Sequence, residues 1–409
     1  MLKLFFAMAG LVVSAIVWAD SPAPEIPLAP PELSRWVGSV VAANPRFQAE
    51  QAAVEAAQAR RRAAGRPLFN PELGLDYERA DVDTVSIGIS QTLDWADKRS
   101  ARASVADHEW RVARARLTQR RRELAGRLLR AWARWRTATA IAGVADRQAD
   151  LMTRFVGLAE RRRRAGDLSQ VDLDLAHLAA SEAKFRQAEA VAGRIRARQS
   201  IESLAATEAS PPAVALSPPE LAEVDIDRLL DVLPTIREAA AMADAARAGV
   251  ELRQRERRAD PTVGLRLGRE DRSALGGLSL TAPLFVRNRF KAEVAAAEAE
   301  ALQAARVVES RRREARARLL AARALYRNAR DAWEEWRAAG APRLRQRTGL
   351  LDRLWQAGEL RTTDYLVQLK QALETETSAI EQEGRLWEAW IEYLAASGQI
   401  EEWLGGIVK

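Results

Sequence analysis

The sequence contains no cysteine in 409 residues and only two histidines. The first absence excludes disulfide bonds, thiol nucleophiles, thiolate metal sites and a lipid-modified cysteine. His108 and His177 each stand in a helical pattern without a second histidine at ligand spacing, so both are interpreted as ordinary helix-surface residues. No nucleophile–base set and no phosphate-binding glycine loop is present either. We therefore expect no enzyme activity, no cofactor and no metal site.

Long apolar runs are also missing, except at the N-terminus. Lys3 is followed by an apolar stretch over residues 4–18 and then by Ala19, a pattern typical of a secretory signal peptide. The alternative is a buried first helix. The interior holds no apolar run long enough for a transmembrane helix. The sequence therefore predicts a signal peptide over residues 1–19 and an exported mature chain.

Aromatic residues make up only 6% of the chain, whereas 29% of the residues are charged. This composition favours long helices. Runs such as "RRRRAG" raise the alternative of nucleic-acid binding, but the 63 Lys and Arg residues are mixed with 56 Asp and Glu residues. Nucleic-acid binders concentrate positive charge on one face. Solvated helix faces and no nucleic-acid partner are the favoured interpretation.

The sequence contains an internal duplication, as four pairs of similar segments indicate. The offset between the copies grows only from 189 to 192 residues along the chain, which indicates one duplication with few insertions. We predict a first repeat over 20–208, a proline-rich linker over 209–224 and a second repeat over 225–409. The paired segments begin at Asn44 and Leu233, Asn70 and Asp260, Ser86 and Gly277, and Ala165 and Ala357.

Each repeat has the same predicted plan, namely helix, β-hairpin, very long helix and shorter returning helix. Proline inside the second long helix, at Pro342, predicts a kink there. The predicted strands lie at about 70–79 and 84–93, and at about 260–269 and 275–284. The predicted helices lie at about 31–66, 98–164 and 169–206, and at about 225–258, 288–356 and 362–397.

The four predicted strands alternate apolar residues with polar or small residues. Strands of about ten residues with this alternation are typical of a transmembrane β-barrel, with one face to lipid and one to the lumen. In lipid every backbone polar group must be paired, so the sheet must close, and four strands cannot close a barrel. The chain must therefore oligomerise, unless the hairpins merely cap a soluble helical rod.

The segment "AGDL" at Ala165–Leu168 and its copy "AGEL" at Ala357–Leu360 predict two tight helical tips, at about 165–169 and 357–361. Gly166 and Gly358 are expected to adopt the left-handed conformation that ends a helix. Ser169 and Asp172 have the spacing of a capping box, and Asp364 repeats Asp172 behind a weaker cap at Arg361. We expect Leu168 and Leu360 to be exposed beside Asp167 and Glu359, which suggests a partner that contacts both tips.

These features resemble the TolC family of outer-membrane efflux proteins over nearly the whole mature chain. The resemblance rests on Asn44-Pro45, on Asn70–Leu73, on the two tips and on the duplicated plan. The stretches "SQTLDWADKRSAR" (Ser90–Arg102) and "APLFVRNRF" (Ala282–Phe290) resemble the heavy-metal branch typified by CzcC.

The resemblance implies a homotrimer in which twelve strands complete one β-barrel above a twelve-helix α-barrel. It also implies that the tips meet a periplasmic adaptor, or membrane fusion protein, and through it an inner-membrane pump of the resistance–nodulation–division (RND) type. The implied docking residues are Gly166, Asp167, Leu168, Asp172, Gly358, Glu359, Leu360 and Asp364.

The resemblance further implies a gate at the tips. Asp172, Trp355 and Asp364 are the gate candidates, and Trp355 is positioned to donate a hydrogen bond to Asp172. The predicted function is an outer-membrane exit duct with a long periplasmic portion that exports heavy-metal cations. The alternative from another class is a periplasmic coiled-coil adaptor or scaffold without a barrel.

Overall fold

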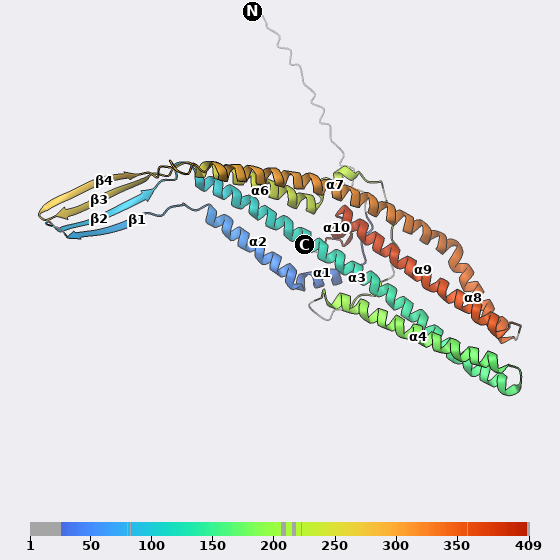
Figure 1. The fold of residues 1–409 in the computed structure, drawn as a ribbon. Coiled ribbons are helices and arrows are strands. Elements are labelled where there is room, and N and C mark those ends of the chain that lie inside the picture. The colour runs from blue at the N-terminus through green and yellow to red at the C-terminus, as the bar shows by residue number, and fades with distance from the viewer. Residues whose placement is uncertain are drawn as a thin grey trace, which may run out of the picture.

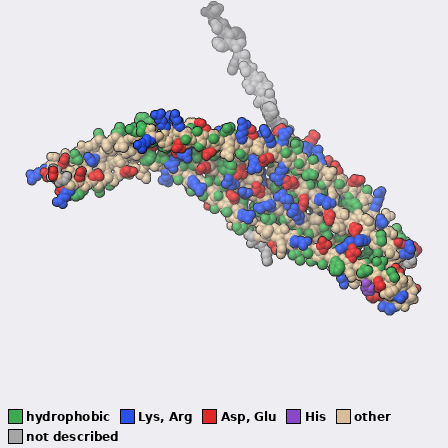
Figure 2. All heavy atoms as spheres, viewed as in Figure 1, with side chains coloured by type: hydrophobic (Ala, Val, Ile, Leu, Met, Phe, Trp, Pro, Cys, Tyr) green, Lys and Arg blue, Asp and Glu red, His purple; other side chains and the backbone are tan. Residues whose placement is uncertain are grey.

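The computed structural model describes residues 26–79, 81, 83–205, 210–214, 218–221, 223–357 and 359–406. The predicted signal peptide lies outside these residues. The described chain is a long, gently curved rod, with a β-sheet at one end and two helical tips at the other (Figure 1). Basic and acidic side chains are interspersed over the visible face of the helices, as expected for solvated helix faces (Figure 2).

One long helix, α3, is the axis of the first repeat. Helices α2 and α4 lie one after the other along it, α2 toward the sheet and α4 toward the tip (Figure 1). This end-to-end arrangement allows two shorter helices to cover one long neighbour. The helices of this repeat are α1 (Pro31–Ala43), α2 (Pro45–Ala64), α3 (Lys98–Ala165) and α4 (Gln170–Glu202).

The second repeat has the same arrangement, with α6 and α9 packed against α7 and with α8 reaching the tip. Helix α3 also packs against α6 and α9, which joins the two repeats side by side. The elements are α5 (Ile226–Val232), α6 (Pro234–Glu256), α7 (Lys291–Glu335), a π-helical turn η1 (Trp336–Gly340), α8 (Ala341–Gln356), α9 (Thr362–Ser397) and α10 (Ile400–Trp403).

The first predicted helix of each repeat is in fact two helices, so that prediction is wrong at one position in each. The breaks fall at Asn44 and Leu233, because the residue before proline is driven out of the helical region. Asn44 then caps α2 by accepting hydrogen bonds from the backbone N–H groups of Arg46 and Phe47. Its side-chain amide also donates to the carbonyl of Leu204 at 2.8 Å, which ties the start of α2 to the segment after α4.

The predicted kink near Pro342 is confirmed. Helix α7 ends at Glu335 and continues through the π-helical turn η1 into α8. Proline has no N–H to donate, and its ring clashes with a carbonyl one turn earlier, which a wider turn relieves. Helix α8 visibly changes direction relative to α7 on its way to the tip (Figure 1).

The four strands form one antiparallel sheet in the order β1-β2-β3-β4. In the register of this sheet, paired residues of neighbouring strands place apolar side chains on the same face. One row consists of Leu73, Ile89, Leu265 and Leu278, and every one of these side chains is exposed. The strands are β1 (Glu72–Arg79), β2 (Asp83–Thr92), β3 (Thr262–Glu270) and β4 (Ser273–Thr281).

The opposite face of the sheet carries small and polar residues. Gly74, Gly88, Arg266 and Gly277 form the row next to the apolar one. Strand β2 approaches β3 closely at Gly268, where an added Cβ would lie 2.4 Å from the carbonyl oxygen of Val85. The first face is apolar along the middle of the strands, and charged residues such as Arg269 lie on it only near the strand ends. A mainly apolar face and a small, polar face are what the predicted hairpins required.

A buried core at the middle of the rod gathers α1, α10, the end of α9 and the centre of α3. Trp132 is fully buried there, lies edge-on to Trp387, and donates from its indole N–H to the carbonyl of Pro212 at 3.0 Å. The hydroxyl of Tyr326 donates to the carbonyl of Pro219. The described part of the proline-rich linker is thus held against the helices.

Candidate functional site

The first tip ends α3 with a left-handed glycine. Gly166 has φ 87° and ψ 1°, and nothing lies within 4 Å of a Cβ built on it, so backbone conformation and not space requires glycine. The N–H of Asp167 donates to the carbonyl of Arg162 at 2.9 Å, the bond typical of a Schellman cap. The predicted conformation of Gly166 is confirmed.

Helix α4 begins at once behind this turn. Ser169 is its N-cap, and its hydroxyl oxygen accepts from the backbone N–H of Asp172 at 3.1 Å. The same hydroxyl donates to the Asp172 carboxylate at 2.6 Å. Leu168 and Leu173 pack against one hydrophobic cluster of the tip, as the staple spacing predicts. The cap and the staple together fix the direction in which α4 returns.

The second tip is closed in the same way with a weaker cap. The N–H of Glu359 donates to the carbonyl of Leu354 at 2.9 Å, the counterpart of the bond in the first tip. Gly358 itself lies outside the described residues. Arg361 is the N-cap of α9 and offers no side-chain cap, but its guanidinium forms an ion pair with Asp364 at 3.1 Å. Asp364 and Asp172 thus occupy matching positions in the two tips.

A stack of three aromatic rings joins the two tips. Phe155 on α3, Trp355 on α8 and Tyr365 on α9 all contact one another. Their ring centroids lie 4.6 Å (Phe155–Trp355), 5.5 Å (Phe155–Tyr365) and 4.9 Å (Trp355–Tyr365) apart. The guanidinium of Arg162 covers the Trp355 ring at 5.0 Å from its centroid and donates to the Trp355 carbonyl at 3.4 Å. Aromatic pairs of this kind contribute roughly 0.5–1.5 kcal/mol beyond their buried area. These contacts pack the two tips of one chain against each other.

Two predictions about the tips are wrong. Trp355 does not donate to Asp172, because its indole N–H is buried without a partner and the Asp172 carboxylate is occupied by Ser169. Stacking against Phe155 holds the ring instead. Leu168 and Leu360 are half-buried in the tip cluster rather than exposed, although Asp167 and Glu359 beside them are exposed.

A ladder of ion pairs between α3 and α9 was not predicted. Its rungs include Arg134 with Glu388 at 2.6 Å and Arg147 with Glu376 at 2.7 Å. Each exposed pair is worth little by itself, but a row of them fixes the register of two helices. The spacing of the glutamates along α9 was visible in the sequence. Their partners were not, because they lie more than two hundred residues earlier.

Over the described ranges, no helix is long and apolar enough to cross a membrane. Within those same ranges, no group of three or more His, Asp or Glu side chains is arranged to hold a metal ion.

Comparison with known proteins shows what the chain resembles. The sequence profile described as "Outer membrane efflux protein" matches residues 36–207, which lie in the first repeat. The "Cobalt-zinc-cadmium resistance protein CzcC" of Cupriavidus metallidurans (strain ATCC 43123 / DSM 2839 / NBRC 102507 / CH34) is 26% identical over 239 residues. Over most of its first repeat the chain is therefore similar to outer membrane efflux proteins. The match to CzcC covers 55% of this chain and 56% of CzcC, so it spans about half the length of that relative.

Solved structures extend the likeness to both repeats. CusC matches with a TM-score of 0.76 at 13% identity, over 93% of this chain and 95% of CusC. A membrane protein from Pseudomonas aeruginosa matches with a TM-score of 0.76 at 17% identity, over 91% of this chain and 95% of its own. The open state of the MtrE outer-membrane channel from Neisseria gonorrhoeae matches with a TM-score of 0.71 at 16% identity, over 90% and 89%.

At these identities the structures establish the fold and no more. The predicted fold class, mainly helical with a four-stranded antiparallel sheet of the TolC type, is confirmed. The family comprises outer-membrane channel proteins, not enzymes, so the predicted location and protein class are confirmed as well.

Proposed function

We propose that this protein is the outer-membrane exit duct of a tripartite efflux system. The observation that carries the proposal is the sheet, whose apolar row of Leu73, Ile89, Leu265 and Leu278 is exposed across all four strands. Such a face suits lipid, and the open edges of β1 and β4 suit pairing with further copies. Three chains bring twelve strands to one barrel, and their helices continue it as a periplasmic tunnel.

The two tips are the proposed docking points for a periplasmic adaptor. Each tip offers an exposed acidic residue, Asp167 or Glu359, beside a leucine that anchors the turn in the tip cluster. Asp172 and Asp364 stand beside them at the start of the returning helices. Two similar tips per chain provide six similar docking points per trimer, which accounts for the repetition of the tip motif.

Asp364 is the proposed element of an acidic gate at the tunnel mouth. It forms an ion pair with Arg361 in the same tip, so its carboxylate is already placed at the end of the rod. Trp355 contributes by packing against Phe155, which sets how α8 and α9 lie beside α3. A gate of this kind opens when the packed tips separate.

Heavy-metal cations are the proposed cargo, delivered by an inner-membrane pump of the RND type. Similarity to a protein named for cobalt, zinc and cadmium resistance supports this choice. Because the described chain offers no cluster of metal ligands, selection of the metal belongs to the pump and the duct provides the passage.

Deletion of the gene tests the proposal. We expect the deletion strain to become more sensitive to cobalt, zinc and cadmium salts, with resistance restored by the wild-type gene. A photoreactive residue at position 167 should form a cross-link to the adaptor, whereas the same residue at the exposed position 300 of α7 should not. Unchanged metal sensitivity would contradict the metal cargo, and equal cross-linking at both positions would contradict docking at the tips.

A further inference from the structure

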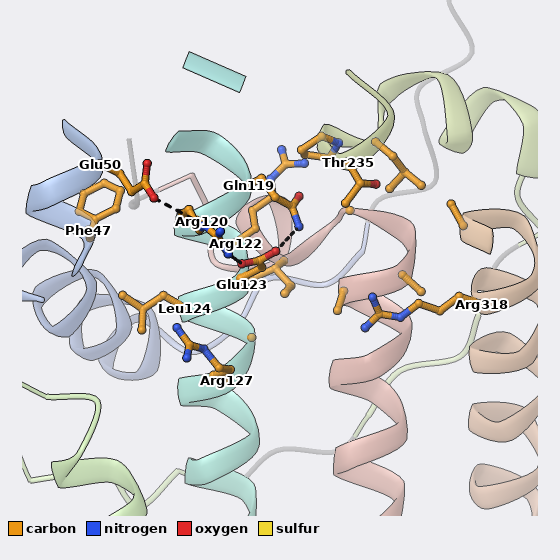
Figure 3. Close-up of a pocket in the computed structure, with 18 of the residues that line it drawn as sticks. Phe47, Glu50, Gln119, Arg120, Arg122, Glu123, Leu124, Arg127, Thr235 and Arg318 are labelled. Carbon is orange, nitrogen blue, oxygen red and sulfur yellow. Dashed lines mark hydrogen bonds and ion pairs between the residues drawn. The ribbon is translucent and has the colours of Figure 1, made fainter. Parts of the chain in front are cut away.

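A cavity of about 740 Å³ lies at the middle of the rod, away from the sheet and the tips. We call it the waist cavity. Its walls come from the start of α2, the centre of α3, the start of α6, α7 and the end of α9. In Figure 3, Phe47 and Glu50 approach from α2, Arg127 from α3, and Arg318 from α7 on the opposite side.

The lining of the waist cavity is unusually rich in guanidinium groups. Seven arginines but only three glutamates line it. Helix α3 separates these charges from the buried core, since Leu128 and Trp132 pack into that core while Arg127 and Arg130 face the cavity. The lining arginines are Arg46, Arg120, Arg122, Arg127, Arg130, Arg311 and Arg318, and the glutamates are Glu50, Glu123 and Glu314.

Carboxylates near the cavity are shared between arginines. Glu392 accepts from Arg318 at 2.7 Å and from Arg130 at 3.5 Å. Burial lowers the pKa of Arg130; Glu392 opposes this shift, and the nearby cations Arg318 and Arg134 add to it. One carboxylate between two guanidinium groups leaves positive charge that the protein itself does not neutralise. Glu401 is shared in the same way, at 2.6 Å from Arg121 and 2.9 Å from Arg122.

Two of the lining arginines lack a carboxylate partner among the described residues. Among the described residues, the side chains of Arg46 and Arg127 form neither an ion pair nor a hydrogen bond. The start of α6 adds to the positive potential, because its N-cap Leu233 offers no side-chain acceptor and Thr235 of its first turn lines the cavity. Helix N-termini carry partial positive charge and unpaired N–H groups.

We propose that the waist cavity binds an oxyanion of the phosphate type, held by Arg46 and Arg127. Guanidinium groups bind phosphate oxygens through paired, charge-assisted hydrogen bonds, and an α-helix N-terminus favours the same charge. A free divalent cation would be repelled by the same residues. The site goes beyond the proposed function, since a duct works without it and its loss would leave the duct in place.

Phosphorus NMR of inorganic phosphate tests the proposal on the purified full-length protein in detergent. We expect the wild-type protein to broaden the phosphate line saturably. The double variant Arg46→Gln/Arg127→Gln should weaken the apparent affinity by roughly tenfold or more, as expected for the loss of charge-assisted bonds. Neither arginine has a partner in the described chain, so the variant leaves no carboxylate unpaired and should fold normally.

A matched control removes the same charge from the same two helices. Arg62 on α2 and Arg154 on α3 are exposed and lie outside the cavity, so Arg62→Gln/Arg154→Gln should bind phosphate like the wild type. Absence of broadening by the wild type, or equal loss of affinity in both double variants, would overturn the site. Unchanged phosphate affinity in Arg127→Lys would also overturn the site, because lysine keeps the charge but lacks the planar guanidinium that donates two parallel hydrogen bonds.

Competition separates two sources of the oxyanion. Glycerol phosphate that displaces inorganic phosphate would indicate a site for a phosphate group on a larger molecule, which the volume of the cavity permits. Failure to displace it would assign the site to the free ion.

Discussion

Leucine to arginine at position 75 should block assembly in the outer membrane, whereas arginine at the neighbouring position 74 should not. Leu75 is the fourth of eight residues of β1, is 75% exposed, and pairs with Ile87 on the apolar face. Gly74 lies on the opposite face, in the row of Arg266, and nothing lies within 4 Å of a Cβ built there. The two substitutions therefore place the same charge on opposite faces of one strand.

The expected difference is large. Arginine on the lipid face near the middle of the bilayer costs roughly 2–4 kcal/mol, and arginine facing the lumen costs about nothing. Three chains multiply the penalty, so a trimer of Leu75→Arg loses roughly 6–12 kcal/mol. This loss is of the same order as a typical net stability of about 5–15 kcal/mol and should prevent insertion.

Outer-membrane fractions run on gels with and without heating provide the assay. Gly74→Arg should yield a heat-labile oligomer in wild-type amounts, and Leu75→Arg should yield none. Equal tolerance of both arginines, or equal loss with both, would refute the assignment of the apolar face to lipid.

Three further changes test the tips and the middle of the rod. Gly166→Pro should abolish metal resistance while the membrane oligomer persists, because proline fixes φ near −65° where Gly166 has 87°; loss of the oligomer would mean that the tip is needed for folding. Trp355→Ala should expose the tips to protease by removing a buried ring worth roughly 3–5 kcal/mol, and Trp355→Phe should not, since the indole N–H has no partner; equal cleavage would contradict the stack. Burial raises the pKa of Tyr326 above its usual 10.0, so the stability that its neutral phenol contributes is present below that pH and is lost as pH rises further. At neutral pH, Tyr326→Phe should lower the free energy of unfolding by about 0.5–1.5 kcal/mol, because it removes one hydrogen bond. Above pH 10, urea titrations should show a smaller further loss of stability for Tyr326→Phe than for the wild type. Parallel curves of stability against pH for the two proteins would contradict this.

Local signals in the sequence located the strands and tips well. The alternation of apolar residues placed β1 and β2 to within two residues at each end, because period and turn residues act locally. β4 begins two residues earlier and ends three residues earlier than predicted, because pairing with β3 decides where it stops. The repeat and linker boundaries at 208, 209, 224 and 225 stay predictions.

Contacts between segments that are distant in the chain could not be predicted from the sequence. Phe155 and Trp355 stand two hundred residues apart in the sequence, and only the meeting of the two tips stacks their rings. The resemblance to a family suggested a hydrogen bond from Trp355 to Asp172. In the structure the Asp172 carboxylate instead accepts a hydrogen bond from the hydroxyl of Ser169, which is only three residues away. The waist cavity was missed for the same reason, because its arginines come from three helices that share no local pattern.

Extraction of membranes with alkaline carbonate distinguishes an integral outer-membrane duct from a periplasmic scaffold. We expect the protein to stay in the outer-membrane pellet after the wash and to run as a heat-labile species of three chains when solubilised. Release of the protein into the supernatant as a monomer would contradict this expectation, since a sheet with an exposed apolar face and two open edges would then have no lipid and no partner copy to cover it.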